Sequence, residues 1–212
     1  MVVSGDLTQR ARARQFREAR AYLDTLPRPQ FVVPGNHDVP LYNVFARFLA
    51  PLGGYRRIIA GDVEPSFVDD EIAVLGVNTA RSFVFKGGRV SEAQLARVEE
   101  RLCRLGRDVV KILVTHHPFM ALQRLAGCGL DVLLAGHLHA AHRILDQAAL
   151  LVQAGTATSH RKRAEPNSFN VLRVTRGRIE VEEYSMRGPE FLRSAKDVFR
   201  REDGRWRRDG SA

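Results

Sequence analysis

The sequence has few cysteines, few lysines and no long apolar run. Cys103 and Cys128 lack CxxC spacing and fall on separate expected helices, which favours thiols packed in a reducing compartment over a disulfide or a metal site. No apolar run approaches the roughly 20 residues of a membrane span, and the N-terminus has no apolar leader core. We therefore expect a cytoplasmic protein without a membrane partner.

The net charge of +9 comes almost entirely from arginine, because the chain has only four lysines. The arginines gather in an expected helix at residues 10–20 and near the C-terminus at 200–208. Acidic residues are interspersed and no nucleic-acid-binding motif is present, so a nucleic-acid partner is not expected. The excess of positive charge instead favours small anionic substrates.

The length of 212 residues, 44% of them hydrophobic, is enough for one domain with a sizeable core. We expect this domain at residues 1–186. Beyond Met186 the apolar pattern weakens, which predicts a basic, partly disordered tail at residues 187–212.

Short apolar runs alternate with helical patterns, which predicts an α/β fold. Phe16 and Leu23 belong to an apolar stripe at helical spacing, and Ser91 with Gln94 forms a capping box that begins a second helix. Residues 66–69 and 72–78 predict a hairpin and hence a mixed sheet. A helix is expected at 120–126, and further strands are expected at 1–4, 31–33, 109–115, 132–135, 150–153, 169–174 and 179–184.

Four short segments place metal-ligand side chains where apolar runs end, the position at which α/β folds gather their chemistry. They are Gly5-Asp6, Gly35-Asn36-His37-Asp38, His116-His117-Pro118 and Gly136-His137-Leu138-His139. The carboxylate of Asp6 can bridge two cations, and Asn36 offers a neutral amide oxygen. His137 and His139 are two residues apart, so both side chains can leave the same side of an extended segment.

Several residues near these segments have two readings. His37 suits proton transfer above a metal ion, or a hydrogen bond within its own loop. His117 either supports the site as a hydrogen-bond donor or packs beneath Pro118. Asn78 and Arg81 either meet a phosphate or lie on a surface loop.

Taken in order, the segments resemble the calcineurin-like metallophosphoesterase superfamily, whose pattern runs Asp-x-His, Gly-Asp, Gly-Asn-His-Asp/Glu, a strand-end His and Gly-His-x-His. Within it, Ser-Gly-Asp-Leu-Thr, Thr-His-His-Pro-Phe and Ala-Gly-His-Leu-His look most like bacterial class III cyclic-nucleotide phosphodiesterases. The resemblance implies a four-layer αββα sandwich. It also implies two divalent ions, manganese, iron or zinc, that activate a hydroxide for attack on phosphorus.

The same resemblance implies the role of each site residue. Asp6 would bridge the metals, Asn36, His116 and His137 would complete one metal site, and His139 would belong to the other. His37 would be the catalytic imidazole, and Asn36 and His37 would meet the phosphate of the substrate.

The Asp-x-His block is absent, since only five residues precede Asp6. The second metal would keep only Asp6 and His139, so a single bound metal is also expected. Three explanations stay open: a chain begun one strand late, a natural one-metal variant, or a decayed copy. A sheet that lacks its first strand exposes an edge that a homodimer would cover.

These features together predict a metal-dependent phosphoesterase that acts on small phosphodiesters or phosphomonoesters, cyclic nucleotides among them. The alternative is a truncated or decayed, non-catalytic member of the same fold that binds a metal or a ligand.

Overall fold

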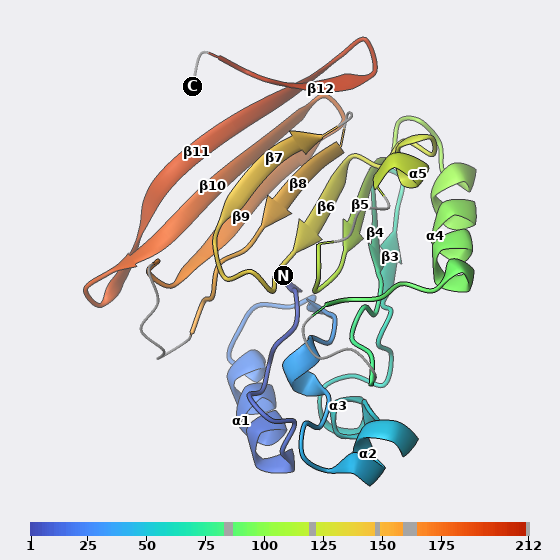
Figure 1. Ribbon diagram of the computed structural model, residues 1–212. Helices are drawn as coiled ribbons and strands as arrows, with labels where there is room; N and C mark the ends of the chain where they lie inside the picture. Colours follow the sequence, from blue (N-terminus) through green and yellow to red (C-terminus); the bar gives the residue numbers. More distant parts are fainter. Residues whose placement is uncertain (83–86, 119–121, 147–148, 159–164, 211–212) are drawn as a thin grey trace.

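Two β-sheets form the centre of the computed structural model, and helices lie at their flank and at one end (Figure 1). The structure describes residues 1–82, 87–118, 122–146, 149–158 and 165–210. The strands are β1 (Val2–Val3), β2 (Phe31–Val32), β3 (Ser66–Val68), β4 (Ile72–Gly76), β5 (Val110–Val114), β6 (Val132–Ala135), β7 (His142–Asp146), β8 (Ala149–Gln153), β9 (Ser168–Thr175), β10 (Arg178–Arg187), β11 (Glu190–Glu202) and β12 (Arg205–Arg208). The helices are α1 (Ala13–Asp24), α2 (Val44–Leu49), α3 (Gly53–Ile58), α4 (Glu92–Arg104) and α5 (Leu122–Ala126), with a 3-10 turn at Asn36–Asp38.

The larger sheet is mixed, in the order β3-β4-β5-β6-β8-β7. β4, β5, β6 and β8 run parallel, while β3 and β7 pair antiparallel at the two edges. Every residue of β5 is buried, as expected for an inner parallel strand covered on both faces. Parallel β5 and β6 end at the same edge of the sheet, so His116 and His137, which follow them, are brought together.

The smaller sheet is an antiparallel meander, β9 to β12, and it faces the larger one across the main core. Ile112 of β5 and Val152 of β8 pack in this core with Val181 of β10 and Phe199 of β11. On the opposite face of the larger sheet, Leu133 packs with Leu102 of α4 and other buried residues in a second core. The expected α/β class with two facing sheets is confirmed.

The two longest helices begin and pack as their sequence patterns predict. In α4, the hydroxyl of Ser91 accepts the backbone N–H of Gln94 at 3.2 Å, and Val98 and Leu102 are buried. In α1, Phe16 and Leu23 are buried on one face. The helix expected at 120–126 is confirmed from Leu122 on, and its first two residues lie outside the described ranges.

The N-terminal strands β1 and β2 form a parallel pair of their own, in which Val2 lies opposite Phe31 and Val3 opposite Val32. This register places the loops after the two strands side by side. A third core lies below them, where the buried Tyr55 of α3 donates its hydroxyl hydrogen to the Val32 carbonyl at 2.9 Å. α1, α2 and α3 gather at this end of the molecule (Figure 1).

The expectation of two free thiols is wrong. Cys103 in the last turn of α4 and Cys128 just after α5 form a disulfide, with their Cα atoms 4.5 Å apart. The pairing follows from the packing of α5 against α4, which a sequence separation of 25 residues does not reveal. The cysteines therefore give no support to a reducing compartment.

The expectation of a partly disordered tail at residues 187–212 does not hold for residues 190–202 and 205–208, which form β11 and β12. The reason is tertiary: Trp206 is 3% exposed, and its indole Nε1 donates to Asp131 Oδ1 at 2.8 Å. The Arg201 guanidinium pairs with the same carboxylate and lies over the Trp206 ring. A buried aromatic anchor thus fixes a segment whose composition is otherwise basic.

Among the described residues, no helix combines the length and the apolar character that crossing a bilayer requires.

Trp206 is expected to hold the C-terminal strands in place. Trp206→Ala should lower the free energy of unfolding by about 3–5 kcal/mol, because it removes a large buried ring and takes the indole donor from Asp131. Urea unfolding followed by circular dichroism measures this loss. Arg205→Ala, on the same strand with an exposed side chain, is the matched control and should change stability little. Equal stabilities of the two variants would contradict the anchoring role.

Candidate metal centre

Loops that follow four strands converge at one end of the sheets. His116 Nε2 lies 3.0 Å from Asn36 Oδ1 and 3.3 Å from Asp6 Oδ1. His137 Nδ1 lies 3.1 Å from the same Asn36 oxygen. The structure therefore brings together Asp6, Asn36, His116 and His137, the four residues that the family resemblance assigns to one metal site.

The proton on His116 can be placed from its hydrogen bond to the main chain. His116 Nδ1 lies 2.6 Å from the Ser4 carbonyl oxygen. A carbonyl only accepts, so Nδ1 carries the proton and Nε2 of the neutral ring keeps its lone pair. That lone pair then faces two further acceptors, the oxygens of Asn36 and Asp6. Such a meeting of acceptor atoms is the arrangement that a cation stabilises.

His117 lies beside this centre. Among the described residues, His116, His117 and His137 place one ring nitrogen each within 4.8 Å of one another. His117 Nδ1 is paired with the Thr79 hydroxyl at 2.8 Å, while its buried Nε2 has no hydrogen-bond partner in the described structure. A buried imidazole nitrogen without a partner is costly, and a metal ion would satisfy it.

The electrostatics keep the buried imidazoles neutral, which is the form that binds metals. Burial lowers the pKa of His116, although Asp6 and the hydrogen bond to Ser4 act in the opposite direction. Burial, with smaller contributions from His116 and His137, lowers the pKa of His117 to about 3. At neutral pH both rings therefore present lone pairs.

The backbone is strained at the candidate ligands. Asp6, His137 and His139 have positive φ angles of 59°, 71° and 60°. Residues other than glycine rarely adopt this backbone region. Such outliers concentrate at functional sites. Gly35 lies so close to Asp6 that a Cβ atom there would collide with its backbone and carboxylate, so the two loops approach at a distance only glycine allows.

His37 and His139 lie at the edge of this convergence. The backbone N–H of His37 donates to Asp6 Oδ1 at 3.0 Å, and its ring Nδ1 lies 3.1 Å from the Gln9 carbonyl oxygen. His139 Nδ1 lies 2.8 Å from the Thr156 hydroxyl, and His139 is not part of the three-histidine group. Its predicted role at a second metal stays a prediction.

Asp38 is the functional residue that sequence reasoning missed. Its buried carboxylate accepts the backbone N–H groups of Gly35 at 2.9 Å, Thr8 at 3.0 Å and Leu7 at 3.3 Å. It thus joins the loop that carries Asp6 to the loop that carries Asn36. Burial raises its pKa to about 7, aided by the nearby Asp6, while the three N–H groups oppose the shift. An acidic residue in a turn, next to backbone donors, was the only signal in the sequence.

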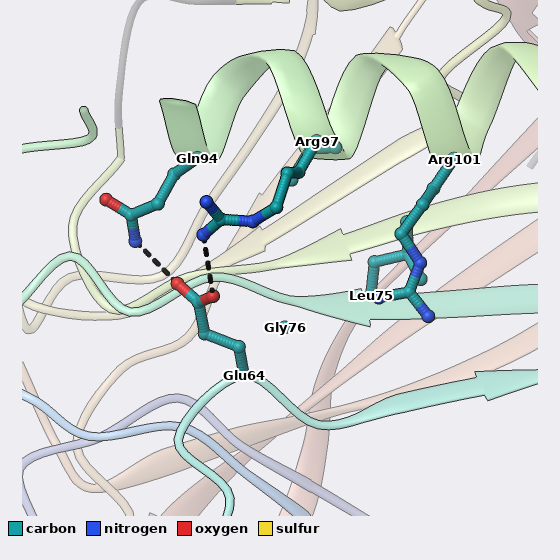
Figure 2. Close-up of a pocket in the computed structure, with 7 residues that line it drawn as sticks. Glu64, Leu75, Gly76, Gln94, Arg97 and Arg101 are labelled. Carbon is teal, nitrogen blue, oxygen red and sulfur yellow. Dashed lines mark hydrogen bonds and ion pairs between the residues drawn. The ribbon is translucent and has the colours of Figure 1, made fainter. Parts of the chain in front are cut away.

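The loop residues Asn78 and Arg81 have structural partners instead of a place at the centre. Asn78 Oδ1 accepts the Ala80 N–H at 3.0 Å, and Arg81 pairs with Gln94. Gln94 in turn borders a cavity of about 90 Å³ between β4 and α4. Figure 2 shows Gln94 and Arg97 turned toward the Glu64 carboxylate in this cavity. Glu64 accepts from both Gln94 and Arg97, Arg101 donates to Ser66, and none of the lining residues belongs to the convergence.

Asp38→Ala should lower the free energy of unfolding by about 2–4 kcal/mol, because three backbone donors between the two loops lose their acceptor. Asp69→Ala is the matched control: Asp69 also accepts two backbone N–H groups, but in an exposed hairpin turn, where water replaces it. The control should lose about 1 kcal/mol or less. Urea denaturation of both variants measures the difference, and equal losses would show that the two loops do not depend on Asp38.

Comparisons with known proteins identify a family for the chain. A family model described as calcineurin-like phosphoesterase matches residues 1–141, more than half of the chain. No curated protein sequence matches significantly.

Solved structures show likeness at the level of the fold. GAP50 of Plasmodium, described as the anchor in the inner membrane complex, has 15% identity and a TM-score of 0.60, with 92% of this chain and 76% of that chain covered. Chaetomium thermophilum Vps29 has 14% identity and a TM-score of 0.51, with 94% and 79% covered. Phosphopantetheinyl hydrolase from Mycobacterium tuberculosis has 14% identity and a TM-score of 0.46, with 73% and 78% covered. On the strength of the family model, the chain belongs to the calcineurin-like phosphoesterase family.

Proposed function

We propose that this chain hydrolyses phosphate esters with the help of a divalent metal ion. The observation that carries the proposal is the approach of His116 Nε2 to two oxygen atoms, Asn36 Oδ1 at 3.0 Å and Asp6 Oδ1 at 3.3 Å. Manganese, iron and zinc suit such a mixture of imidazole, amide and carboxylate ligands. When bound, the ion supplies a Lewis acid for the phosphoryl oxygens and lowers the pKa of water.

The ligand set that we propose extends the one predicted from sequence by one residue. His116 and His137 contribute imidazoles, as predicted, and the unpartnered Nε2 makes His117 the third. Thr79 orients the His117 ring through its Nδ1, in the way that hydrogen bonds behind metal ligands fix their tautomer. Asn36 and Asp6 add oxygen atoms close to His116 Nε2.

His37 is the residue that we propose moves the proton. Its Nδ1 donates to the Gln9 carbonyl, so Nε2 of the same ring is the atom that can carry a proton to the leaving oxygen of the ester. The backbone N–H of His37 donates to Asp6 Oδ1, which holds this residue next to one of the proposed ligands. The side chain is partly exposed, which leaves room for a substrate phosphate.

The substrate that we propose is a small phosphodiester or phosphomonoester, with cyclic nucleotides as one class to test. The net charge of +9 favours anionic molecules in general. The likeness to solved structures concerns the fold alone, so it does not select among substrates. A cytoplasmic location and a homodimer remain predictions.

The second candidate function is binding of one metal or ligand without turnover. The three histidines form one compact group, while His139 is paired with Thr156. With Asp6 as its other expected ligand, a second metal would have few protein donors. One metal per chain is therefore the stoichiometry that the described geometry supports best.

His117→Ala should weaken metal binding by at least about tenfold, because it removes a ligand from the centre. Isothermal titration with zinc or manganese and elemental analysis measure affinity and stoichiometry without depending on activity. His142→Ala removes an exposed histidine from β7 and should leave both unchanged. Unchanged affinity in His117→Ala would return His117 to a packing role.

His37→Ala should lower kcat for bis(p-nitrophenyl) phosphate by roughly 10²–10⁴-fold, as expected when a general acid is lost. Metal content should stay at the wild-type value, since His37 is not a ligand in this assignment. Steady-state kinetics on the metal-loaded protein measure the change. Wild-type protein that holds its metal but hydrolyses neither this substrate, p-nitrophenyl phosphate nor cyclic nucleotides would favour the binding function instead.

A further inference from the structure

Helix α2 has its polar and apolar faces reversed relative to a helix that faces water. Its one charged residue, Arg47, is 4% exposed and donates to the Pro40 carbonyl at 2.9 Å. Phe45 and Leu49 of the same helix are 79% and 82% exposed. A surface helix normally buries its apolar stripe and leaves its charges in solvent. The outward face of α2 is therefore built to meet an apolar phase.

The exposed apolar side chains extend beyond the helix and form one patch over residues 41–49. Tyr42 and Val44 are 69% and 61% exposed, and Leu41 is 43% exposed. Isolated exposed apolar residues are common, but a contiguous set marks an interaction site. We call residues 41–49 the α2 patch.

Positive charge lies against the α2 patch at Arg10 and is carried by the helices at the same end of the molecule. The Arg10 guanidinium lies 5.3 Å from the centroid of the Tyr42 ring, which places the start of the arginine cluster against the patch. α1 and α3 lie at the same end of the molecule as α2 (Figure 1). They carry further exposed arginines, and no ion pair within the described structure involves Arg12, Arg17 or Arg57. The exposed arginines of α1, of α3 and of the residue just before α1 are Arg12, Arg14, Arg17, Arg56 and Arg57.

We propose that the α2 patch docks on a membrane surface rich in anionic phospholipid. Aromatic and aliphatic side chains flanked by arginines match the boundary between acyl chains and negatively charged headgroups. A second copy of the chain fits less well, because a two-fold contact would bring the same arginines together. Nucleic acid also fits less well: Tyr42, Phe45 and Phe48 offer rings on which bases stack, but the aliphatic Leu41, Val44 and Leu49 match acyl chains and not nucleotides.

This inference departs from the expectation of no membrane partner, which rested on the lack of a spanning segment. Docking on a surface needs only a short apolar face and adjacent charge. It also stands apart from the proposed hydrolysis, because neither the patch nor the arginines include a candidate metal ligand.

The test is co-sedimentation of the purified full chain with two kinds of vesicle, one of phosphatidylcholine alone and one of equal parts phosphatidylcholine and phosphatidylglycerol. We expect binding to the anionic vesicles, weakened by salt because the arginines contribute electrostatically. Phe45→Ser with Leu49→Ser should lower the partition coefficient by about tenfold or more. Arg12→Gln with Arg17→Gln should lower it in low salt and remove part of the salt dependence.

The matched control is Phe67→Ser with Val68→Ser, which removes exposed apolar side chains from the edge strand β3, each about half exposed in the wild type. Its partition coefficient should equal that of the wild type. Three outcomes would overturn the proposal: no binding to either vesicle, equal binding by the Phe45 and Leu49 variant, or light scattering that shows a dimer which this variant abolishes. Circular dichroism melts confirm folding, and the arginine variant supplies an independent test if the apolar variant unfolds.

Discussion

The candidate centre depends on one buried carboxylate that holds two loops together. Asp38 accepts backbone N–H groups from Leu7, Thr8 and Gly35, so the loop after β1 and the loop after β2 cannot separate without leaving donors unsatisfied. Burial disfavours the charge of this carboxylate, as its raised pKa of about 7 shows, while the three donors favour the charge. The bonds to Asp38 thus set the position of Asp6 relative to Asn36. A metal site needs the distance between its ligands fixed to a fraction of an ångström.

The two histidines His116 and His137 are brought together by the pairing of strands in the sheet and not by contacts between loops. β5 and β6 are adjacent parallel strands, so the residues that follow them, His116 and His137, arrive at the same edge without any further device. The Ser4 carbonyl then selects the tautomer of His116, and Thr79 holds the ring of His117 through its Nδ1. The lone pair of His116 Nε2 is thereby directed toward Asn36 and Asp6. Asp6 is the one carboxylate among the proposed ligands, so a divalent cation would be only partly neutralised.

Local features of the structure could be predicted from the sequence, whereas features that depend on tertiary contacts could not. Strand ends at Val114 and Ala135 and the cap at Ser91 follow from apolar periodicity and turn residues, so the positions of Asp6, Asn36, His116 and His137 could be foreseen. The place of His117 beside the centre could not be foreseen, because its ring is paired with Thr79, 38 residues away in the chain. Trp206 reaches Asp131 across 75 residues, so a tail that looks basic and irregular proved to be part of a sheet. The disulfide likewise depends on how α4 packs with α5.

The α2 patch and the candidate centre belong to one continuous segment, and this connection limits how either can change. Asp38 ends the 3-10 turn that begins at Asn36, and Arg47 bonds back to the carbonyl of Pro40, two residues after Asp38. Burying Arg47 has two consequences at once: it turns Phe45 and Leu49 outward, and it ties α2 to the end of the loop that carries Asn36 and His37. A surface that engaged Phe45 and Leu49 would thus bear on a segment whose other end is held by the Asp38 carboxylate. Helix α2 therefore has two roles in this proposal: it supports the loop that carries Asn36 and His37, and it presents the α2 patch.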